Sequence, residues 1–551
     1  MSLSATNLKV YVHPKIGARN PKIYRGEGSM VFRYFRIFSV VLSISFIAVF
    51  SGSSSAFGEG SVSSPETERA GLRLSLDDLI KRVHERNERI HYQQLEWGIS
   101  QDAVKDAKGI FEPQLVTSYL HDKSHIPKTI EDYSSLGFID SENDTYWKRN
   151  NEYNAAVENI LPTGAQVRVG YSLKELQSSM LNSSATDAQY QTFVGGSVVQ
   201  PLLKNAGIGV TMASVRVAEA DSDMAMQGYR REMLQVVAEA ASAYWNLCLA
   251  QEKLKVRRES VRIAGEILRD NRERVRTGKM AQTEVMEAEA GLALRKSLEI
   301  AAKQELISAV NNIKTLFSLS TDESEELIVA VDALAPRDII NVDFESSYRM
   351  SLKMRPEYIS TMRKIEREGI RIAYAENQRW PQLDLKASYG INGLDDASPR
   401  GSWSMAKDRD YESWTVGLEL RIPLMGGRKA KSELAAAKKR KEQTLLELKA
   451  TEVALANAVD TSIKNVRNAL SQADSYAEAV RLNEHLLKVE LARLNAGISN
   501  SRLVLDRDEE LNRAKEYYLE SLVNFEKAFI ALRAVQGNLL RNYGIDIMEE
   551  S

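Results

Sequence analysis

The chain has 551 residues, and its 73 basic and 75 acidic residues give a formal net charge of −2. No excess of positive charge therefore favours nucleic acid as a partner. The only cysteine, Cys248, excludes an intrachain disulfide bond. Charged residues make up 27% of the chain and hydrophobic ones 43%, which is typical of a helix-rich protein, and the length allows one extended repeat architecture.

The first predicted element is a secretory leader within residues 1–56, with the signal peptide at about 30–56. Arg33 and Arg36 precede the apolar run 38–50, and small residues suited to cleavage follow it. Met30 opens this signal, so residues 1–29 are interpreted as an upstream extension of the start. A membrane anchor is disfavoured because the apolar run is short for a bilayer span. After Ala56 no stretch predicts a membrane helix, so membrane insertion would require strands.

Beyond the leader the chain repeats one pattern, first over 57–335 and then over 336–551. In each half a charged, alanine-rich helix is predicted, over 71–115 and over 345–385. Both helices end at the tripeptide Pro-Gln-Leu, which begins at Pro113 in the first half and at Pro381 in the second. Each tripeptide is predicted to open a strand.

A second proline in each half introduces a long helical stretch. Pro201 and Pro423 are the predicted elbows between strand and helix, and the helices after them are interrupted at Gly278 and Gly497. The distance from proline to glycine is nearly equal in the two halves, which supports a duplication. A continuous helix of this length would extend about 100 Å, far beyond the needs of a compact domain.

Two strands of the second half alternate apolar and polar side chains with period two. The apolar positions occupy every second residue of 383–391 and of 414–422. In an outer-membrane barrel such a face meets lipid, while the charged face lines water. The segment 392–413 between these strands suits an extracellular loop.

The first half contains additional strand signals. A strand begins at Leu115 and another ends at Val198, and between them residues 153–171 predict an extra hairpin around Pro162-Thr163-Gly164. This hairpin either joins the barrel or caps it. The chain thus supplies four strands, or six with the hairpin, and both numbers fall short of the roughly eight strands that close a membrane barrel. Several copies must therefore complete it.

The long helices carry apolar stripes at coiled-coil spacing, which predict packing against partner helices. The stripe residues are Met233, Val237, Ala241, Tyr244 and Cys248, then Tyr518, Leu522, Phe525, Phe529 and Leu532. The predicted fold is α+β: a transmembrane β-barrel, completed by several copies of the chain and continued by a long α-helical coiled-coil barrel, with two structural repeats per chain.

In its motifs and their order the sequence resembles the TolC-type outer-membrane efflux family over residues 71–545. The likeness is carried by the following motifs: Gln200-Pro201-Leu202-Leu203, Tyr244-Trp245, Gly278 with Glu284 and Glu287, Ile422-Pro423-Leu424-Met425-Gly426-Gly427, and Gly497 with Asp506. The resemblance implies a homotrimer in which each chain gives four strands to a barrel of 12. It further implies a periplasmic adaptor (membrane fusion) protein and an inner-membrane transporter as partners, with lipid of the outer membrane around the barrel.

The resemblance also implies site residues at the two glycine turns. Adaptor hairpins would contact a periplasmic tip formed by Thr277, Gly278 and Lys279 and by Ala496, Gly497 and Ile498. Acidic residues of the family follow the second glycine by six and nine positions, where this chain has Leu503 and Asp506. Only one acidic ring is therefore expected at the gate, and Arg502 is placed to pair with Asp506. The family's tyrosine three residues before the second glycine is also absent, and Leu494 stands in its place.

No cofactor, metal site or catalytic residue is predicted. His121 and His125 are placed in a polar loop without a third ligand, and no converging set of titratable groups predicts an enzyme. The predicted function is a passive outer-membrane exit duct of a tripartite efflux pump or type I secretion system. The alternative is a soluble periplasmic coiled-coil adaptor. The cargo, whether drugs, metal ions or polypeptides, is not specified by the sequence.

Overall fold

The computed structural model describes residues 72–130, 145–179, 188–318, 328–335, 342–424 and 426–545. All of them belong to one compact unit, Arg69–Ser551. The predicted leader, residues 1–56, and Met425 of the second elbow lie outside the described residues.

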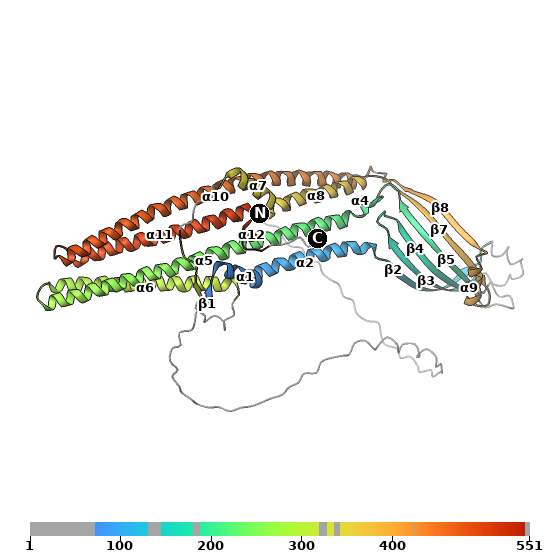
Figure 1. Ribbon diagram of the computed structural model, residues 1–551. Coiled ribbons are helices and arrows are strands. Elements are labelled where there is room, and N and C mark those ends of the chain that lie inside the picture. The colour runs from blue at the N-terminus through green and yellow to red at the C-terminus, as the bar shows by residue number, and fades with distance from the viewer. Residues whose placement is uncertain are drawn as a thin grey trace, which may run out of the picture. The chain divides into compact units, whose positions relative to one another are not determined.

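Long helices and one large sheet make up the described part of the chain (Figure 1). The helices are α1 (Leu76–Arg86), α2 (Glu88–Lys108), the short 3₁₀ helix η1 (Gly109–Phe111), α4 (Ile208–Thr211), α5 (Ala213–Arg276), α6 (Gln282–Leu316), α7 (Phe344–Met354), α8 (Pro356–Asn377), α9 (Pro399–Asp408), α10 (Arg428–Asn495), α11 (Ser501–Gln536) and α12 (Leu539–Asn542). The strands of the large sheet are β2 (Gln114–Pro127), β3 (Thr145–Ile160), β4 (Gln166–Ser178), β5 (Gln189–Pro201), β7 (Gln382–Asp395) and β8 (Glu412–Arg421). Two short strands, β1 (Leu72–Leu74) and β6 (Ile328–Ala330), pair in parallel.

The helices that precede the sheet are broken where the sequence predicted continuity. Asn87 separates α1 from α2, and its side chain accepts hydrogen bonds from the backbone N–H groups of Arg89 and Ile90. Arg355 separates α7 from α8, and Pro356 occupies the first turn of α8. The prediction of one helix over 71–115 and one over 345–385 is therefore wrong, because an asparagine cap and a proline each start a new helix.

The large sheet is antiparallel, with the strand order β2-β3-β4-β5-β7-β8. The predicted extra hairpin is confirmed as β3 and β4, which lie inside the sheet between β2 and β5. Six strands, and not the four that the resemblance implied, therefore belong to this chain. The placement of His121 and His125 in a loop is wrong, because both belong to β2, whose polar outer half pairs with β3.

The two faces of the sheet differ in chemistry. Strand pairing aligns one apolar row across it, with side chains between 47% and 73% exposed: Leu115, Val157, Val169, Tyr389 and Trp414. The opposite face carries ion pairs between neighbouring strands, at 3.1 Å for Arg168–Glu158 and 3.6 Å for Lys174–Glu152. One face therefore suits an apolar environment and the other suits water.

Small residues form a second row across the polar face. Ala156 pairs with Gly170, Gly170 with Gly195, and Gly195 with Gly390. A Cβ atom built on Gly195 would lie 2.6 Å from the carbonyl oxygen of Tyr389. The neighbouring backbones thus approach too closely along this row for a larger side chain at Gly195.

The two longest helices, α5 and α10, have 64 and 68 residues, or about 96 and 102 Å at 1.5 Å per residue. α5 turns back into α6, and α10 turns back into α11. Close to the sheet the helices pack side by side in the order α2-α5-α8-α10. The outer helices of this layer are α2 and α10. In the chain α2 precedes β2 and α10 follows β8, the first and last strands of the sheet.

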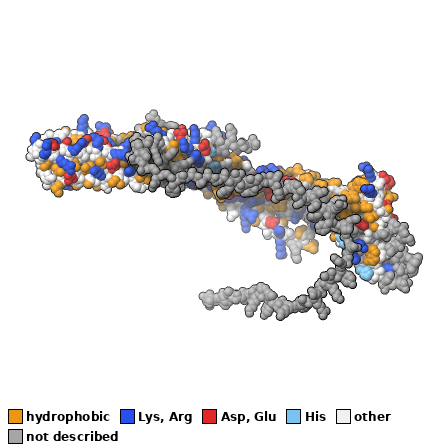
Figure 2. All heavy atoms as spheres, turned by 90° about the horizontal axis from the view of Figure 1, so that it is seen from below, with side chains coloured by type: hydrophobic (Ala, Val, Ile, Leu, Met, Phe, Trp, Pro, Cys, Tyr) orange, Lys and Arg blue, Asp and Glu red, His pale blue; other side chains and the backbone are white. Residues whose placement is uncertain are grey.

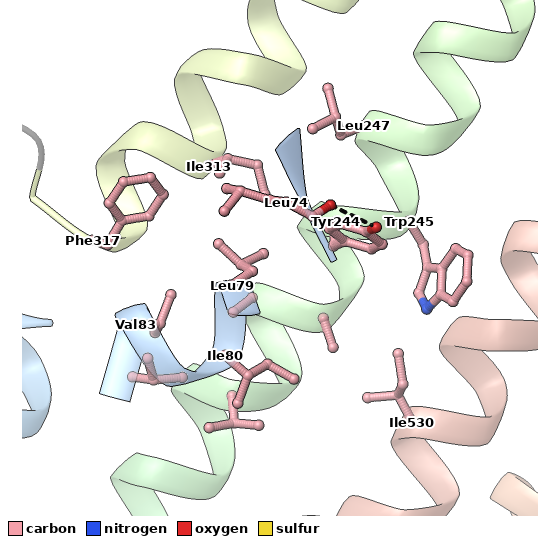
Figure 3. Packing of buried hydrophobic residues seen from close by; sticks show 14 of the residues in the cluster. Leu74, Leu79, Ile80, Val83, Tyr244, Trp245, Leu247, Ile313, Phe317 and Ile530 are labelled. Carbon is pink, nitrogen blue, oxygen red and sulfur yellow. Dashed lines mark hydrogen bonds between the residues drawn. The ribbon is translucent and has the colours of Figure 1, made fainter. Parts of the chain in front are cut away.

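The largest hydrophobic core lies around the middle of α5 (Figure 3). The first predicted stripe is confirmed, since Met233, Val237, Ala241, Tyr244 and Cys248 are all buried. The hydroxyl oxygen of Tyr244 lies 2.6 Å from an Asp332 carboxylate oxygen and 3.1 Å from the carbonyl oxygen of Leu74. Through these contacts α5 holds the small β1–β6 sheet. In the second stripe Leu522, Phe525 and Leu532 are buried.

Away from this core, hydrophobic side chains are interspersed with lysine, arginine, aspartate and glutamate over the visible surface of the helical end (Figure 2). Among the described helices, none combines the length and the apolar character that crossing a membrane requires.

Candidate functional site

Two glycine turns, one in each helical hairpin, have the same backbone geometry. Gly278 and Gly497 adopt φ values of +71° and +74°, in the left-handed region. The N–H of Gly278 donates to the carbonyl oxygen of Val275 at 2.9 Å, and that of Gly497 donates to the carbonyl oxygen of Leu494 at 3.1 Å. Both helices therefore end in a glycine-dependent C-terminal cap.

The predicted tip residues Thr277, Gly278 and Lys279 and Ala496, Gly497 and Ile498 are all exposed. Ile498 presents an apolar side chain that is 68% exposed. The two turns are joined across the hairpins, because the Arg274 guanidinium donates to the Leu494 carbonyl oxygen at 3.4 Å and the Asn271 amide donates to the Ser501 hydroxyl at 2.8 Å. The structure thus places both predicted turns at one exposed end.

Replacing Gly497 with alanine is expected to cost about 1 kcal/mol, because an L residue is strained at positive φ. Crowding makes no contribution, since a Cβ atom there would meet nothing within 4 Å. Hydrogen exchange of the α10–α11 turn measures the effect. Gly265→Ala is the control: this glycine lies inside α5 in equally open space, and alanine is expected to stabilise it there by about 1 kcal/mol. Equal effects of both changes would contradict the argument.

The predicted gate residues lie on the first two turns of α11. Asn500 caps this helix by accepting a hydrogen bond from the N–H of Leu503 at 3.0 Å. Arg502, Leu503 and Asp506 are exposed, with Leu503 at 45%. Within the described part of this chain no ion pair includes Arg502 or Asp506. The three side chains are therefore free to face another molecule or another copy.

A buried charge pair, which the sequence analysis missed, lies behind these exposed residues. The Asp508 carboxylate is 1% exposed and its Oδ2 accepts hydrogen bonds from Ser260 at 2.6 Å, Arg295 at 3.2 Å and Asn512 at 3.0 Å. Arg295 also donates to the carbonyl oxygen of Leu505. This network connects α5, α6 and α11, and thus the two helical hairpins.

More ion pairs join α5 to α11 beyond this network, further from the turns. Arg257 lies 3.2 Å from Glu509 and 2.6 Å from Glu516, and Lys253 lies 2.6 Å from Glu520. The basic residues are four positions apart on α5, and the acidic residues recur on one side of α11. In the sequence this spacing could have indicated a charged helix face, but it did not identify which helix was the partner.

The predicted elbows both lie at the end of the sheet where the long helices begin. Pro201 ends β5, and the chain then passes through Gly207, at φ +93°, into α4 and α5. Pro423 follows β8, and Gly427, at φ +66°, precedes α10. The Asn377 side chain at the end of α8 binds the first elbow, accepting from the N–H of Asn205 at 2.7 Å.

Among the described residues no cluster of three or more histidine, cysteine or acidic side chains could hold a metal ion. The candidate functional features are the apolar sheet face, the exposed turns and the gate residues on α11.

Comparison with known proteins gives one consistent result. The model of the outer membrane efflux protein family matches residues 150–318 and 363–538. The alkaline protease secretion protein AprF of Pseudomonas aeruginosa is 22% identical over 363 residues, covering 64% of this chain and 71% of that protein. The outer membrane protein TolC of Escherichia coli is 22% identical over 317 residues, covering 56% of this chain and 63% of that protein.

The fold is shared with solved channel structures. The CmeC outer membrane channel of Campylobacter jejuni superposes with a TM-score of 0.58 and 13% sequence identity, covering 88% of this chain and 94% of that one.

Proposed function

The chain belongs to the outer membrane efflux protein family and is an outer-membrane exit channel of an export system, and we propose that three copies form the complete duct. It lies in the outer membrane and extends into the periplasm. The alternative of a soluble periplasmic adaptor does not fit these relatives. The proposal assigns no catalytic residue and no cofactor to the chain.

The observation that carries the proposal is the sheet with one exposed apolar face, one charged face and two unpaired edges. Among the strands that the structure describes, β2 and β8 each have a neighbour on one side only. In lipid an unpaired strand edge leaves backbone N–H and C=O groups without partners, at several kcal/mol each. Further copies complete the barrel, with the apolar face toward lipid and the ion-paired face toward water.

An internal duplication explains why both halves feed this assembly, and we propose the repeats 57–335 and 336–551 as its units. Asn87 ends α1 26 residues before Pro113, and Arg355 ends α7 26 residues before Pro381. The two glycine turns share their hydrogen bonds as well. Both correspondences support descent of the halves from one unit.

The exposed turns are the proposed docking surface for a periplasmic adaptor, which connects the duct to an inner-membrane transporter. Thr277, Gly278 and Lys279 would meet the adaptor from one hairpin, and Ala496, Gly497 and Ile498 from the other. The support is their exposure at one common end and the exposed apolar side chain of Ile498. AprF is a secretion protein and the matching family model is that of efflux proteins, so the proposal leaves cargo selection to the partners.

The proposed gate is a ring of three Asp506 carboxylates, one from each copy, beside Leu503 and Arg502. Such a ring attracts cations and repels anions. Asp506→Asn keeps the shape and removes the charge, so it is expected to lower the cation preference of single channels in planar bilayers severalfold. Wild-type selectivity in the Asn variant would remove Asp506 from the gate.

Cell fractionation followed by mass determination in detergent tests the proposed duct. The expected result is a trimer in the outer-membrane fraction that requires detergent for extraction and changes its gel migration on heating. A soluble periplasmic monomer would overturn the proposal.

A further inference from the structure

The inserted hairpin β3–β4 spans the whole sheet. Its own ladder runs from Ile160 paired with Gln166 to Lys148 paired with Ser178. β3 pairs with β2 over the full length of that strand, from Gln114 to Pro127. With 16 and 13 residues, β3 and β4 are as long as the other strands, which have 10 to 14.

The hairpin also continues both faces of the sheet. Val157 and Val169 extend the apolar row and are 47% and 58% exposed. Glu158 and Arg168, the next residues on the two strands, form an ion pair on the polar face. A hairpin that capped the opening would have no reason to keep one face apolar and exposed in register with its neighbours.

The turn of this hairpin lies at the end of the sheet where the helices begin. The carbonyl oxygen of Thr163 accepts a hydrogen bond from the N–H of Gly207 in the first elbow at 3.2 Å. A Cβ atom on Gly164 would lie 2.7 Å from the carbonyl oxygen of Asn205, so the turn fits tightly against that elbow. β3 therefore runs from the far end of the sheet to its helical end, and β4 runs back.

The open edges of the sheet are complementary to each other. Because six is an even number, the first and last strands, β2 and β8, run in opposite directions. Leu115 on β2 and Trp414 on β8 point to the same apolar face and are 73% and 71% exposed. Antiparallel pairing of β2 in one copy with β8 in a second copy would thus keep each face continuous.

The helical layer has its free sides at the same two edges. α2 exposes the apolar side chains of Tyr92, Leu95 and Ile99, which are 61% to 68% exposed and recur at helical spacing. On α10, Leu446 is 70% and Val453 is 55% exposed. A copy whose β8 joins β2 would bring its α10 to the apolar side of α2, which identifies a second copy of this chain as the partner.

We infer that each copy contributes six strands, joined β2 to β8, so that the trimer encloses an eighteen-stranded barrel. This inference rests on the proposed trimeric duct and departs from the 12 strands that the family resemblance implied. With strands about 4.8 Å apart and tilted by about 40°, eighteen strands give a backbone diameter of about 36 Å, against about 24 Å for twelve. The backbone cylinder of the barrel is thus about 1.5 times wider.

Cysteine pairs across the seam test the β2–β8 contact in the full-length protein. Thr415→Cys on β8 is combined in turn with Ser118→Cys, Leu120→Cys and Asp122→Cys on β2, all on the polar face. Oxidation is expected to give covalent dimers and trimers on denaturing gels with at least one pair. Val416→Cys replaces Thr415→Cys in the control, because its side chain is on the opposite face, and at least tenfold less product is expected.

The native thiol does not interfere with this experiment. Cys248 is 3% exposed, and burial raises its pKa to about 12. The wild-type chain therefore serves as the blank.

Labelling with a membrane-impermeant thiol reagent tests whether β3 and β4 line the lumen. Asn154→Cys and Ser172→Cys lie on the polar face, and Val157→Cys and Val169→Cys lie on the apolar face. In intact outer membranes the first two are expected to react at least tenfold faster than the last two, and all four should react after denaturation.

The outcomes separate this inference from the proposed duct. Seam cross-links with alternating labelling in a trimer support eighteen strands. A trimer in which all four cysteines react alike places the hairpin outside the membrane, which overturns the eighteen strands and leaves the trimeric duct intact. A trimer without cross-links from any of the three pairs overturns the β2–β8 seam. A monomer in the soluble fraction overturns both.

Discussion

Replacing Asp508 with alanine is expected to destabilise the junction of the two helical hairpins by about 3–5 kcal/mol. The change leaves the Arg295 guanidinium buried, at 5% exposure, without its carboxylate. Hydrogen exchange of α11 backbone amides measures the effect, and a loss of at least about 100-fold in protection is expected, since 1.4 kcal/mol corresponds to a factor of ten.

Asp506→Ala is the matched control, because it removes the same side chain two residues away, on the exposed side of α11. Its effect on exchange should stay within about 0.5 kcal/mol. In the double variant Asp508→Leu with Arg295→Met, both charges are gone and most of the stability should return. A double variant as unstable as the single one would show that packing, and not the unpaired charge, causes the loss.

Replacing Gly195 with valine is expected to reduce the yield of assembled trimer by about five- to 100-fold. The added Cβ atom would lie 2.6 Å from the Tyr389 carbonyl oxygen and 2.9 Å from the Gly390 Cα, so two backbones must separate. Overpacking of this kind costs about 1–3 kcal/mol. The measured quantity is the fraction of heat-modifiable trimer in outer membranes.

Gly417→Val provides the comparison for this prediction. Gly417 is on the same polar face, in β8, and a Cβ atom there would meet nothing within 4 Å. This variant is expected to assemble like the wild type. Equal trimer yields for Gly195→Val and Gly417→Val would show that the row of small residues does not limit the sheet.

Features that depend on local sequence were predicted well. The ends of α5 and α10 follow from glycines in left-handed conformation, and the first buried stripe follows from helical periodicity. The strands β7 and β8 follow from period-two alternation. Each of these signals is contained within a short stretch of chain.

Features that depend on distant partners were not predictable in the same way. The pair Arg295–Asp508 joins residues 213 positions apart, and nothing around Asp508 distinguishes it from the exposed Asp506. Membership of β3 and β4 in the sheet depends on pairing with β2 and β5, so the sequence left their place open. The break at Asn87 was missed although asparagine is a common helix cap, because helix-forming residues flank it on both sides.

The two open edges of the sheet have a consequence for how copies would assemble. Adding a second copy to the first hides one edge of each and leaves the pair with two unpaired edges, the same number as a single copy. Only ring closure removes both: the third copy forms two β2–β8 contacts where the second forms one, so the larger part of the free-energy gain falls on the last step. Partial assemblies should therefore be scarce at equilibrium, and those that form would present bare strand edges to proteases and chaperones of the periplasm. Selection for complete ducts would then require no dedicated signal in the chain.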